Sequence, residues 1–572
     1  MEDRSSDSVT LPDTLFLRDR ATEALNALTQ YVDEDADCRP YMTGDLSDEP
    51  AHLGHSGWDF GSSVGRMVSA FVLARKLCDT ADALDVEERF RQKLLDMFDE
   101  DGLNYREETD TSVARANMHD QRSVLLGLTT WYLESGDPDT KAAADNLCAA
   151  LKRISVKSGH PHLAKQDYWY FPAVEYTRDG WPSEDMMYLG INIDPSHTSA
   201  RMINPLTKYY EETGNRDALE LARNFARHTV IHSGSFNEDG SFNDGTEFRT
   251  GHFHSRMVSV TSIARFGAVT GNAFYVNWAK KVYEWALTQG TEFGWFPSAL
   301  HDDYDKKHET CTLTDMVELG ILLAENGYVE YWETVERFVR NHLVETQLLD
   351  TDWIVESEDE AADDAYRNVA SRSRGTFPGW AAPNDFVCDV GDDPDVMMCC
   401  NASGTRGLFL AWDNAVTESE GIVSVNLLIN NLSEWATVAS YLPHEGRIDV
   451  TLERDAPELR IRIPSWVDPY TVSLTQDGDD RELGDEGFWE GPFIGLHDVS
   501  GGERVSVRFP VDERRTVERA GGEDYTMEWR GDDVMSISPS GTYAPLYEDR
   551  DVYDEVPMRT VDCDNGHAEV HW

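Results

Sequence analysis

The sequence predicts a mainly helical protein that ends in β structure. We expect helical hairpins stacked in a solenoid or a closed ring, followed by an antiparallel β-sandwich. Two observations support this prediction. From about residue 15 to 345, apolar segments of helical character are closed by turn signals at a recurring spacing. From about residue 421, the pattern changes to short alternating or β-branched runs separated by Gly, Asp and Pro.

Turn signals at Gly136, Gly214, Gly271 and Gly327 mark the helical repeat. These glycines are separated by 78, 57 and 56 residues, and a related break at Thr80 lies 56 residues before the first of them. A unit of about 56 residues accommodates two helices with their loops. The segments before the turns are apolar nearly all round and suit an inner ring, whereas those after the turns are amphipathic and suit an outer ring.

Three histidines share one position in this repeat. His119, His197 and His254 each lie 17 residues before one of the first three repeat glycines, and the same offset from the fourth reaches Thr310. This position is the N-terminal end of successive inner helices, and in a ring all such ends open on one face. A single histidine there is ordinarily a capping or packing residue. Three at one offset favour a shared pocket, where helix N-termini also favour anions and thiolates.

Glu309, Cys311, Cys399 and Cys400 form a candidate metal site. Three thiolates and a carboxylate are a soft ligand set that suits tetrahedral Zn²⁺. Glu-x-Cys can place both donors on one ion if the backbone turns there, as it does at a helix start. Adjacent cysteines seldom form a disulfide with each other, because the resulting ring is strained. The alternative is three unrelated buried cysteines that pack as small hydrophobic side chains.

Residues 346–398 have weaker periodicity and many Asp, Arg, Gly and Pro residues. We expect long loops that cover the face with the helix ends. Arg372, Arg374, Phe377 and Trp380 could line a cleft there, although surface loops carry such residues routinely.

A last helical segment follows Cys400, and the strand-like runs come after it. We therefore expect two domains. Residues 1–415 would form the helical catalytic domain and residues 416–572 the β-sandwich.

Charge excludes some functions. The chain has 106 acidic and 50 basic residues, for a net charge of −56. Nucleic-acid binding is not expected, because such a surface repels phosphates. A diffuse acidic surface with few lysines is typical of proteins built for high salt, where self-repulsion is screened.

The sequence also bears on location. The first ten residues have no basic segment followed by an apolar run, so we expect no secretion signal. No stretch approaches the roughly 18 apolar residues of a membrane span. Eight cysteines in a chain of this length do not form a disulfide scaffold. We expect a soluble cytoplasmic protein with no membrane partner. Whether it forms a homodimer is left open.

Four motifs, together with the repeat helices, resemble glycoside hydrolase family 127, the β-L-arabinofuranosidase family. The motifs are HFHS at residues 252–255, HETC at 308–311, MCCN at 398–401 and RIPSW at 462–466. The resemblance covers most of the chain at the level of motif order. It implies an (α/α)6 barrel followed by β-sandwich material.

The resemblance also implies roles for the site residues. Glu309, Cys311, Cys399 and Cys400 would bind Zn²⁺, and Cys399 would also attack the anomeric carbon as the nucleophile. Zinc keeps the thiolate deprotonated, and a covalent thioglycoside divides the reaction into two displacements. Two displacements retain the configuration of the anomeric carbon.

Two glutamates are further catalytic candidates. The family has a functional glutamate in a Glu-Arg motif, matched here by Glu336 and Arg337; the alternative is a buried salt bridge that braces the metal site. Relatives carry a general acid/base glutamate sixteen residues before the zinc glutamate, but that position here is Phe293, and Glu292 is one residue away. Nearby substitutes are Asp302, Asp303 and Asp305. This departure leaves the acid/base and the arabinofuranoside specificity open.

The leading hypothesis is a zinc-dependent retaining glycoside hydrolase acting on a small carbohydrate, with β-L-arabinofuranosides as the candidate substrates. Two alternatives remain. One is another (α/α)6 carbohydrate enzyme, a uronate hydrolase or lyase, with structural zinc; the other is a non-catalytic, zinc-stabilised carbohydrate-binding protein. The predicted sugar-binding residues are Trp58, His119, His197, His252 and His254.

Overall fold

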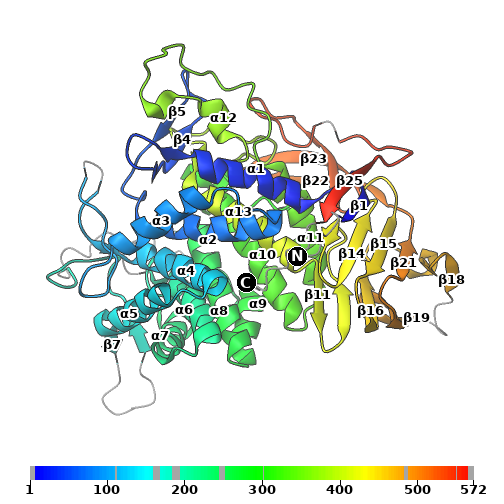
Figure 1. Ribbon diagram of the computed structural model, residues 1–572, viewed down its shortest axis with the longest axis horizontal. Helices are drawn as coiled ribbons and strands as arrows, with labels where there is room; N and C mark the ends of the chain where they lie inside the picture. The colour runs from blue at the N-terminus through cyan, green and yellow to red at the C-terminus, as the bar shows by residue number, and fades with distance from the viewer. Residues whose placement is uncertain are drawn as a thin grey trace, which may run out of the picture.

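The computed structural model describes residues 7–109, 112–158, 168–182, 194–243, 251–300, 302–481, 487–548 and 550–563. Most helices lie on the left of the molecule in Figure 1, and strands β14, β15, β16, β18, β19 and β21 lie on the right. No helix in these ranges is both long and apolar enough to cross a membrane.

Six helices of the described chain form a closed inner ring. Each contacts the next, and the last contacts the first. The repeat therefore closes on itself and does not extend as a solenoid. These helices are buried nearly all round, which explains why their sequences are apolar on every face. They are α2 (Gly61–Cys78), α4 (Met118–Ser135), α6 (Ile203–Thr213), α8 (Phe253–Val269), α10 (Thr310–Glu325) and α13 (Met398–Asp413).

A second set of helices surrounds the ring. Each member packs against the inner helix next to it in the chain, which confirms the alternation of buried and amphipathic segments. They are α1 (Leu17–Gln30), α3 (Leu84–Asp96), α5 (Pro138–Ile154), α7 (Arg216–Arg227), α9 (Ala273–Leu287) and α11 (Tyr331–Phe338). The two rings together make the expected (α/α)6 arrangement.

The repeat glycines end inner helices as expected. Gly136 and Gly214 are the C-caps of α4 and α6, with φ of 66° and 71°. Glycine adopts this left-handed conformation without a steric penalty, and the helix ends there. Asp137 then caps the next outer helix by accepting from the backbone N–H groups of Asp139 and Thr140.

The N-terminal ends of α4, α8 and α10 carry His119, His254 and Thr310, as the repeat predicts. His197 differs, because it ends a short 3₁₀ helix, Pro195–His197, that precedes α6. Pro205 explains the late start of α6, since proline has no N–H and fits only the first turn of a helix.

The C-terminal region contains several sheets. A five-stranded sheet has the order β11-β12-β16-β20-β19, and a six-stranded sheet has the order β13-β14-β15-β21-β17-β18. One cluster of buried side chains includes Val425 and Ile461 from the first sheet and Val438 and Val450 from the second. The prediction of purely antiparallel pairing is wrong for β12 and β16, which run parallel. They can do so because the chain between them leaves to form β13, β14 and β15 in the other sheet.

These strands are short and regular. Those of the five-stranded sheet are β11 (Val416–Ser419), β12 (Ile422–Val425), β16 (Ala456–Arg462), β19 (Gly487–Glu490) and β20 (Phe493–Val499). Those of the six-stranded sheet are β13 (Asn431–Leu432), β14 (Ala436–Ser440), β15 (Arg447–Leu452), β17 (Ser473–Gln476), β18 (Asp479–Arg481) and β21 (Arg504–Arg508).

A three-stranded sheet ties the β region to the helices. It consists of β22 (Glu513–Ala520), β23 (Glu523–Arg530) and β24 (Asp533–Ser538), and its core includes Phe293 and Trp295 from the loop after α9. Strand β1 (Asp7–Pro12) pairs with β25 (Met558–Cys563), so the two ends of the described chain meet.

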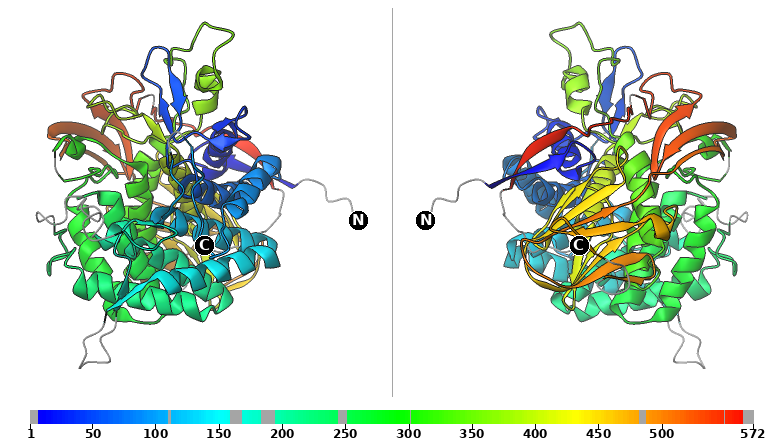
Figure 2. Two further views of the ribbon diagram at one scale, coloured as in Figure 1. Left: turned by 90° about the vertical axis from the view of Figure 1, so that its left-hand side faces the viewer. Right: turned by 90° about the vertical axis from the view of Figure 1, so that its right-hand side faces the viewer.

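Short strands and one short helix shape the loops over the ring. Figure 2 shows the β4–β5 hairpin rising beside the loop that carries α12. The short strands are β2 (Val32–Asp33), β3 (Arg39–Pro40), β4 (Thr43–Asp45), β5 (His52–Gly54), β6 (Ala116–Asn117), β7 (Val156–Ser158), β8 (Tyr168–Tyr170), β9 (Glu175–Tyr176) and β10 (Val396–Met397), and α12 spans Val369–Ser373. Pairing of β10 with β4 and of β6 with β9 holds these loops at the helix ends.

Candidate metal and sugar site

The four predicted metal ligands meet at the starts of α10 and α13. Their ligand atoms all lie within 4.8 Å of one another. The Sγ atom of Cys400 is 3.6 Å from that of Cys311, 4.0 Å from that of Cys399 and 3.9 Å from Oε1 of Glu309. Residues about ninety positions apart come together because α10 and α13 are neighbours in the ring.

The cluster fits a tetrahedral metal ion. An ion with sulfur ligands at about 2.3 Å holds two sulfurs about 3.8 Å apart. The sulfur–sulfur distances of 3.6 and 4.0 Å agree with this spacing. Glu309 occupies the N-cap position of α10, so the chain turns between it and Cys311, as two ligands one residue apart require. Cys311 and Cys400 are fully buried, whereas Cys399 is partly exposed.

Polar groups around the cluster hold its members in place. Nε2 of His252 lies 2.6 Å from Oε2 of Glu309, and its Nδ1 lies 2.8 Å from Oγ of Ser255. The guanidinium of Arg66 approaches Sγ of Cys311 at 3.7 Å and the carbonyl oxygen of Cys399 at 3.5 Å. Hydrogen bonds from neighbouring thiols, that of Cys311 foremost, and the charge of Arg66 hold the pKa of the Cys399 thiol well below its ordinary value.

A cavity of about 610 Å³ opens beside the cluster. Its wall contains all five predicted sugar-binding residues together with Glu309 and Cys399. The imidazole rings of His119, His197 and His252 follow one another with centroid separations of 5.8 and 6.1 Å, and Trp58 meets His119 edge-on at 5.3 Å. The shared pocket predicted from the repeat is therefore present.

Two of the cavity histidines, His119 and His197, are held in the neutral form. Burial, followed by the charge of Arg201, lowers the pKa of His119 and of His197 well below the ordinary value. Arg201 donates to Nδ1 of His119 and, at 2.6 Å, to Oγ of Ser255. His119 therefore keeps its hydrogen on Nε2 and can donate it as a hydrogen bond.

The two glutamates predicted to act in catalysis lie elsewhere. Glu292 is exposed, and its carboxylate lies 2.9 Å from Nη1 of Arg514 on β22. The loop after α9 packs against the three-stranded sheet, which turns this residue away from the cavity wall. Of the nearby aspartates, Asp305 is exposed, and the side chains of Asp302 and Asp303 lie outside the described residues.

Glu336 lies on α11 and is buried where this helix packs against the β region. Its carboxylate accepts from Nε of Arg340 at 2.6 Å, from the N–H of Leu428 at 2.7 Å and from Arg462. It does not line the cavity. These contacts match the alternative interpretation of a buried salt bridge, although it braces the β region and not the metal ligands.

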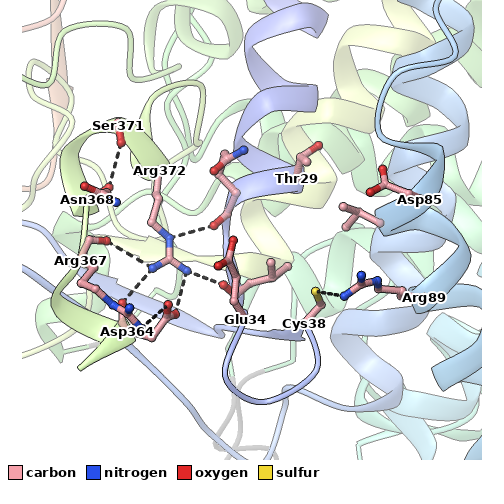
Figure 3. A pocket seen from close by; sticks show the side chains of 13 residues that line it. Thr29, Glu34, Cys38, Asp85, Arg89, Asp364, Arg367, Asn368, Ser371 and Arg372 are labelled. Carbon is pink, nitrogen blue, oxygen red and sulfur yellow. Dashed lines mark hydrogen bonds and ion pairs between the residues drawn. The ribbon is translucent and has the colours of Figure 1, made fainter. Parts of the chain in front are cut away.

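The four loop residues that were predicted to line one cleft lie at different places in the structure. Trp380 lines the cavity beside the cluster. Phe377 is buried against Gly404, and Arg374 pairs with Glu23 at 2.8 Å. Arg372 lies at a second cavity of about 480 Å³ (Figure 3).

At that second cavity, Arg372 donates to the carbonyl oxygens of Gln30 and Asp364, each at 2.9 Å, and so fixes the α12 loop to α1. A group of three acidic side chains lies next to it, but each has a cationic or hydrogen-bonding partner. Asp33 bonds to His55, Asp35 to Arg367 and Asp364 to Arg372. These contacts are structural.

Sequence reasoning missed several charged residues of the site, and three of them are buried. Arg66 and Arg201 line the cavity, and Asp315 lies behind it, bonded to His254. One signal could have found them, because each is a charged residue within or next to an otherwise apolar inner helix. Such a charge is buried at a cost unless it has a partner or a function.

Comparison with solved structures finds this fold at low sequence identity. A family 127 β-L-arabinofuranosidase from Geobacillus stearothermophilus T6 is 12% identical with a TM-score of 0.59, over 91% of this chain and 80% of that one. A glycoside hydrolase is 14% identical with a TM-score of 0.58, over 93% and 83%. A family 127 β-arabinofuranosidase is 14% identical with a TM-score of 0.57, over 90% and 78%.

The similarity is one of structure. No family profile matches the sequence, and no curated protein matches it by sequence. The alignments nevertheless include both the ring of helices and the β region, since they extend over at least 90% of the chain. The chain therefore has the fold of the glycoside hydrolase family 127 structures.

Proposed function

We propose that the protein is a retaining glycoside hydrolase with a Zn²⁺ ion held by Glu309, Cys311, Cys399 and Cys400, and with Cys399 as the nucleophile. One observation carries the proposal. Cys399 belongs to the metal cluster and also lines the cavity, whereas Cys311 and Cys400 are fully buried behind it. A thiolate with both positions can be held by the metal and can face a sugar.

The donor set supports zinc in preference to harder cations. Three sulfurs and one carboxylate oxygen suit Zn²⁺, whereas magnesium and calcium require oxygen ligands. When bound, zinc keeps its cysteines as thiolates at neutral pH. The protein would hold this site through His252, which fixes the orientation of Glu309, and through Arg66, whose charge offsets that of the thiolates.

The cavity suits a small sugar. Its volume of about 610 Å³ lies within the range of small-molecule sites. His119 presents an N–H donor for a hydroxyl group, and Trp58 and Trp380 present aromatic faces for the apolar side of a sugar ring. Because His119 and His197 are neutral, they can exchange hydrogen bonds with hydroxyl groups without a charge mismatch.

The reaction would run in two displacements. Sγ of Cys399 forms a bond to the anomeric carbon while the bond to the leaving oxygen breaks, and water then displaces the sulfur. The product keeps the anomeric configuration of the substrate. The names of the similar structures make β-L-arabinofuranosides the first substrates to test.

One observation favours a second substrate class. Arg66, Arg115 and Arg201 all line the cavity. Arg66 faces the thiolates and Arg115 pairs with Glu175. Arg201, which bonds to His119 and Ser255, is thus the guanidinium that would attract a sugar carrying a carboxylate. A uronide-specific enzyme on the same fold is therefore the second candidate function.

The test is a panel of aryl glycosides, both neutral pentosides and uronides, assayed in molar salt with and without a chelator. Turnover that the chelator abolishes, with retained configuration in the first product seen by NMR, supports the proposal. Inversion of configuration would rule out a cysteine nucleophile. Absence of turnover across the panel, with sugar binding intact, would favour a zinc-stabilised carbohydrate-binding protein.

A further inference from the structure

Among the residues that the structure describes, the cavity of the proposed hydrolase has no unpartnered carboxylate that could serve as a general acid. The leaving oxygen of a glycoside needs a proton as its bond breaks. Glu292 and Glu336 lie away from the cavity wall. Among the described residues, the cavity is lined by two carboxylates, and both have a partner. Glu309 is a metal ligand bonded to His252, and Glu175 is paired with Arg115.

A buried histidine–aspartate pair lies beside the same cavity, with His254 in the cavity wall and Asp315 behind it. Nδ1 of His254, in the first turn of α8, lies 2.6 Å from Oδ2 of Asp315 on α10. His254 also lines the cavity, and its Nε2 atom is buried with no hydrogen-bond partner in the described part of the chain. A nitrogen in this position costs free energy unless a ligand contacts it.

The other three histidines that line the cavity in the described part of the chain cannot transfer a proton in the same way. His252 has both ring nitrogens bonded within the protein, to Ser255 and Glu309. His119 accepts from Arg201 at Nδ1, so losing its Nε2 hydrogen would leave an imidazolate. His197 has a free Nε2, but its Nδ1 meets only the hydroxyl of Ser255, at 3.5 Å.

The surroundings of the pair favour the state in which Asp315 is protonated and both side chains are neutral. Burial lowers the pKa of His254 to about 3. Burial raises the pKa of Asp315 well above its ordinary value. Both shifts favour neutral side chains. Asp315 then donates its proton to Nδ1 of His254, and the ring hydrogen lies on Nε2.

We propose that His254 is the general acid and base of the glycosidase reaction and that Asp315 is its positioning residue; this inference rests on the proposed function. As Sγ of Cys399 bonds to the anomeric carbon, the electrons of the glycosidic C–O bond pass to the leaving oxygen. That oxygen takes the proton of His254 Nε2, and the proton of Asp315 moves to Nδ1. In the second step Nε2 takes a proton from water, whose oxygen displaces the sulfur, and Asp315 is protonated again from Nδ1.

The experiment varies the leaving group. Wild-type protein and the His254→Gln and Asp315→Asn variants are assayed with 2,4-dinitrophenyl, 4-nitrophenyl and benzyl glycosides of a sugar that the wild type hydrolyses. We expect both variants to lower kcat/KM for the benzyl glycoside by about 10²- to 10⁴-fold. The value for the dinitrophenyl glycoside should stay close to wild type, because that group leaves without protonation. Added azide should replace water in the second step and release a glycosyl azide.

Matched variants separate catalysis from binding. The His197→Gln variant removes the other unbonded histidine nitrogen of the cavity, Nε2 of His197. In this variant kcat/KM should fall by the same factor for all three leaving groups. Zinc content and circular dichroism show that each variant is folded. The proposal would be overturned if kcat/KM fell by the same factor for all three glycosides in both His254→Gln and Asp315→Asn. It would also be overturned if the dependence on the leaving group appeared in Glu175→Gln. Failure of the wild type to hydrolyse any glycoside would instead refute the proposed function.

Discussion

Replacing Glu336 with glutamine should destabilise the protein without changing the chemistry of the site. Glu336 is the common acceptor for Arg340, Arg462 and the N–H of Leu428 at a fully buried junction between α11 and the β region. Glutamine preserves the shape but removes the charge that two buried guanidinium groups require. Breaking a buried ion pair from one side costs about 3–5 kcal/mol. Arg340 keeps Asp533 at 3.3 Å, so we expect the lower end of that range.

Denaturant unfolding of wild type and Glu336→Gln in the same salt measures this loss, and kcat is compared per folded molecule. The pKa of Glu336 is held below its ordinary value by Arg462 and Arg340, against the effect of burial. Its contribution to stability is therefore present above the pKa of an unfolded glutamate and is lost as the pH falls through the lower folded value. The destabilisation should shrink toward acid pH. A variant of wild-type stability that has lost turnover would refute this reasoning and make Glu336 catalytic.

Three further predictions concern the metal, the nucleophile and salt. Elemental analysis should find about one zinc per chain. The Cys311→Ser variant lacks a fully buried ligand and should lose both the metal and thermal stability. Wild-type protein that contains no zinc when it is prepared without chelator would contradict this prediction. The Cys399→Ser variant keeps three ligands and should retain most of its zinc. Its kcat should fall at least about 10³-fold, because a serine hydroxyl is a far weaker nucleophile than a thiolate. Near-normal turnover would exclude a cysteine nucleophile. With a net charge of −56, unfolding followed by circular dichroism should show a loss of stability below molar salt, where the Debye length exceeds about 3 Å; full stability in dilute buffer would show that the acidity has another cause.

The ring and the shared pocket could be predicted because they follow from local patterns that repeat. A glycine with positive φ ends an inner helix, and the residue 17 positions earlier must lie at the start of that helix. This register placed His119 and His254 correctly and aligned Glu309 with them. His197 deviates because Pro195 and Pro205 divide its segment into a 3₁₀ helix and a later α-helix.

The remaining features depend on contacts between distant parts of the chain. Whether Glu292 faces the cavity is decided by how its loop packs against β22–β24, more than two hundred residues later. The parallel pairing of β12 with β16 depends on the route of the chain between them. Asp315 is one of three acidic residues in α10, and only the position of α8 shows that it contacts His254.

The most direct test of the central claim is to identify the thiol that reacts with a sugar-shaped electrophile. A haloacetamido glycoside of a hydrolysed sugar is added at neutral pH, and the labelled peptide is identified by mass spectrometry. The other seven cysteines are internal controls. Burial raises the pKa of Cys78 and of Cys388 to about 11, so these thiols should react slowly. We predict that label appears on Cys399 in step with loss of activity and that free sugar protects it. Label on another residue, or full activity after Cys399 is modified, would contradict the account.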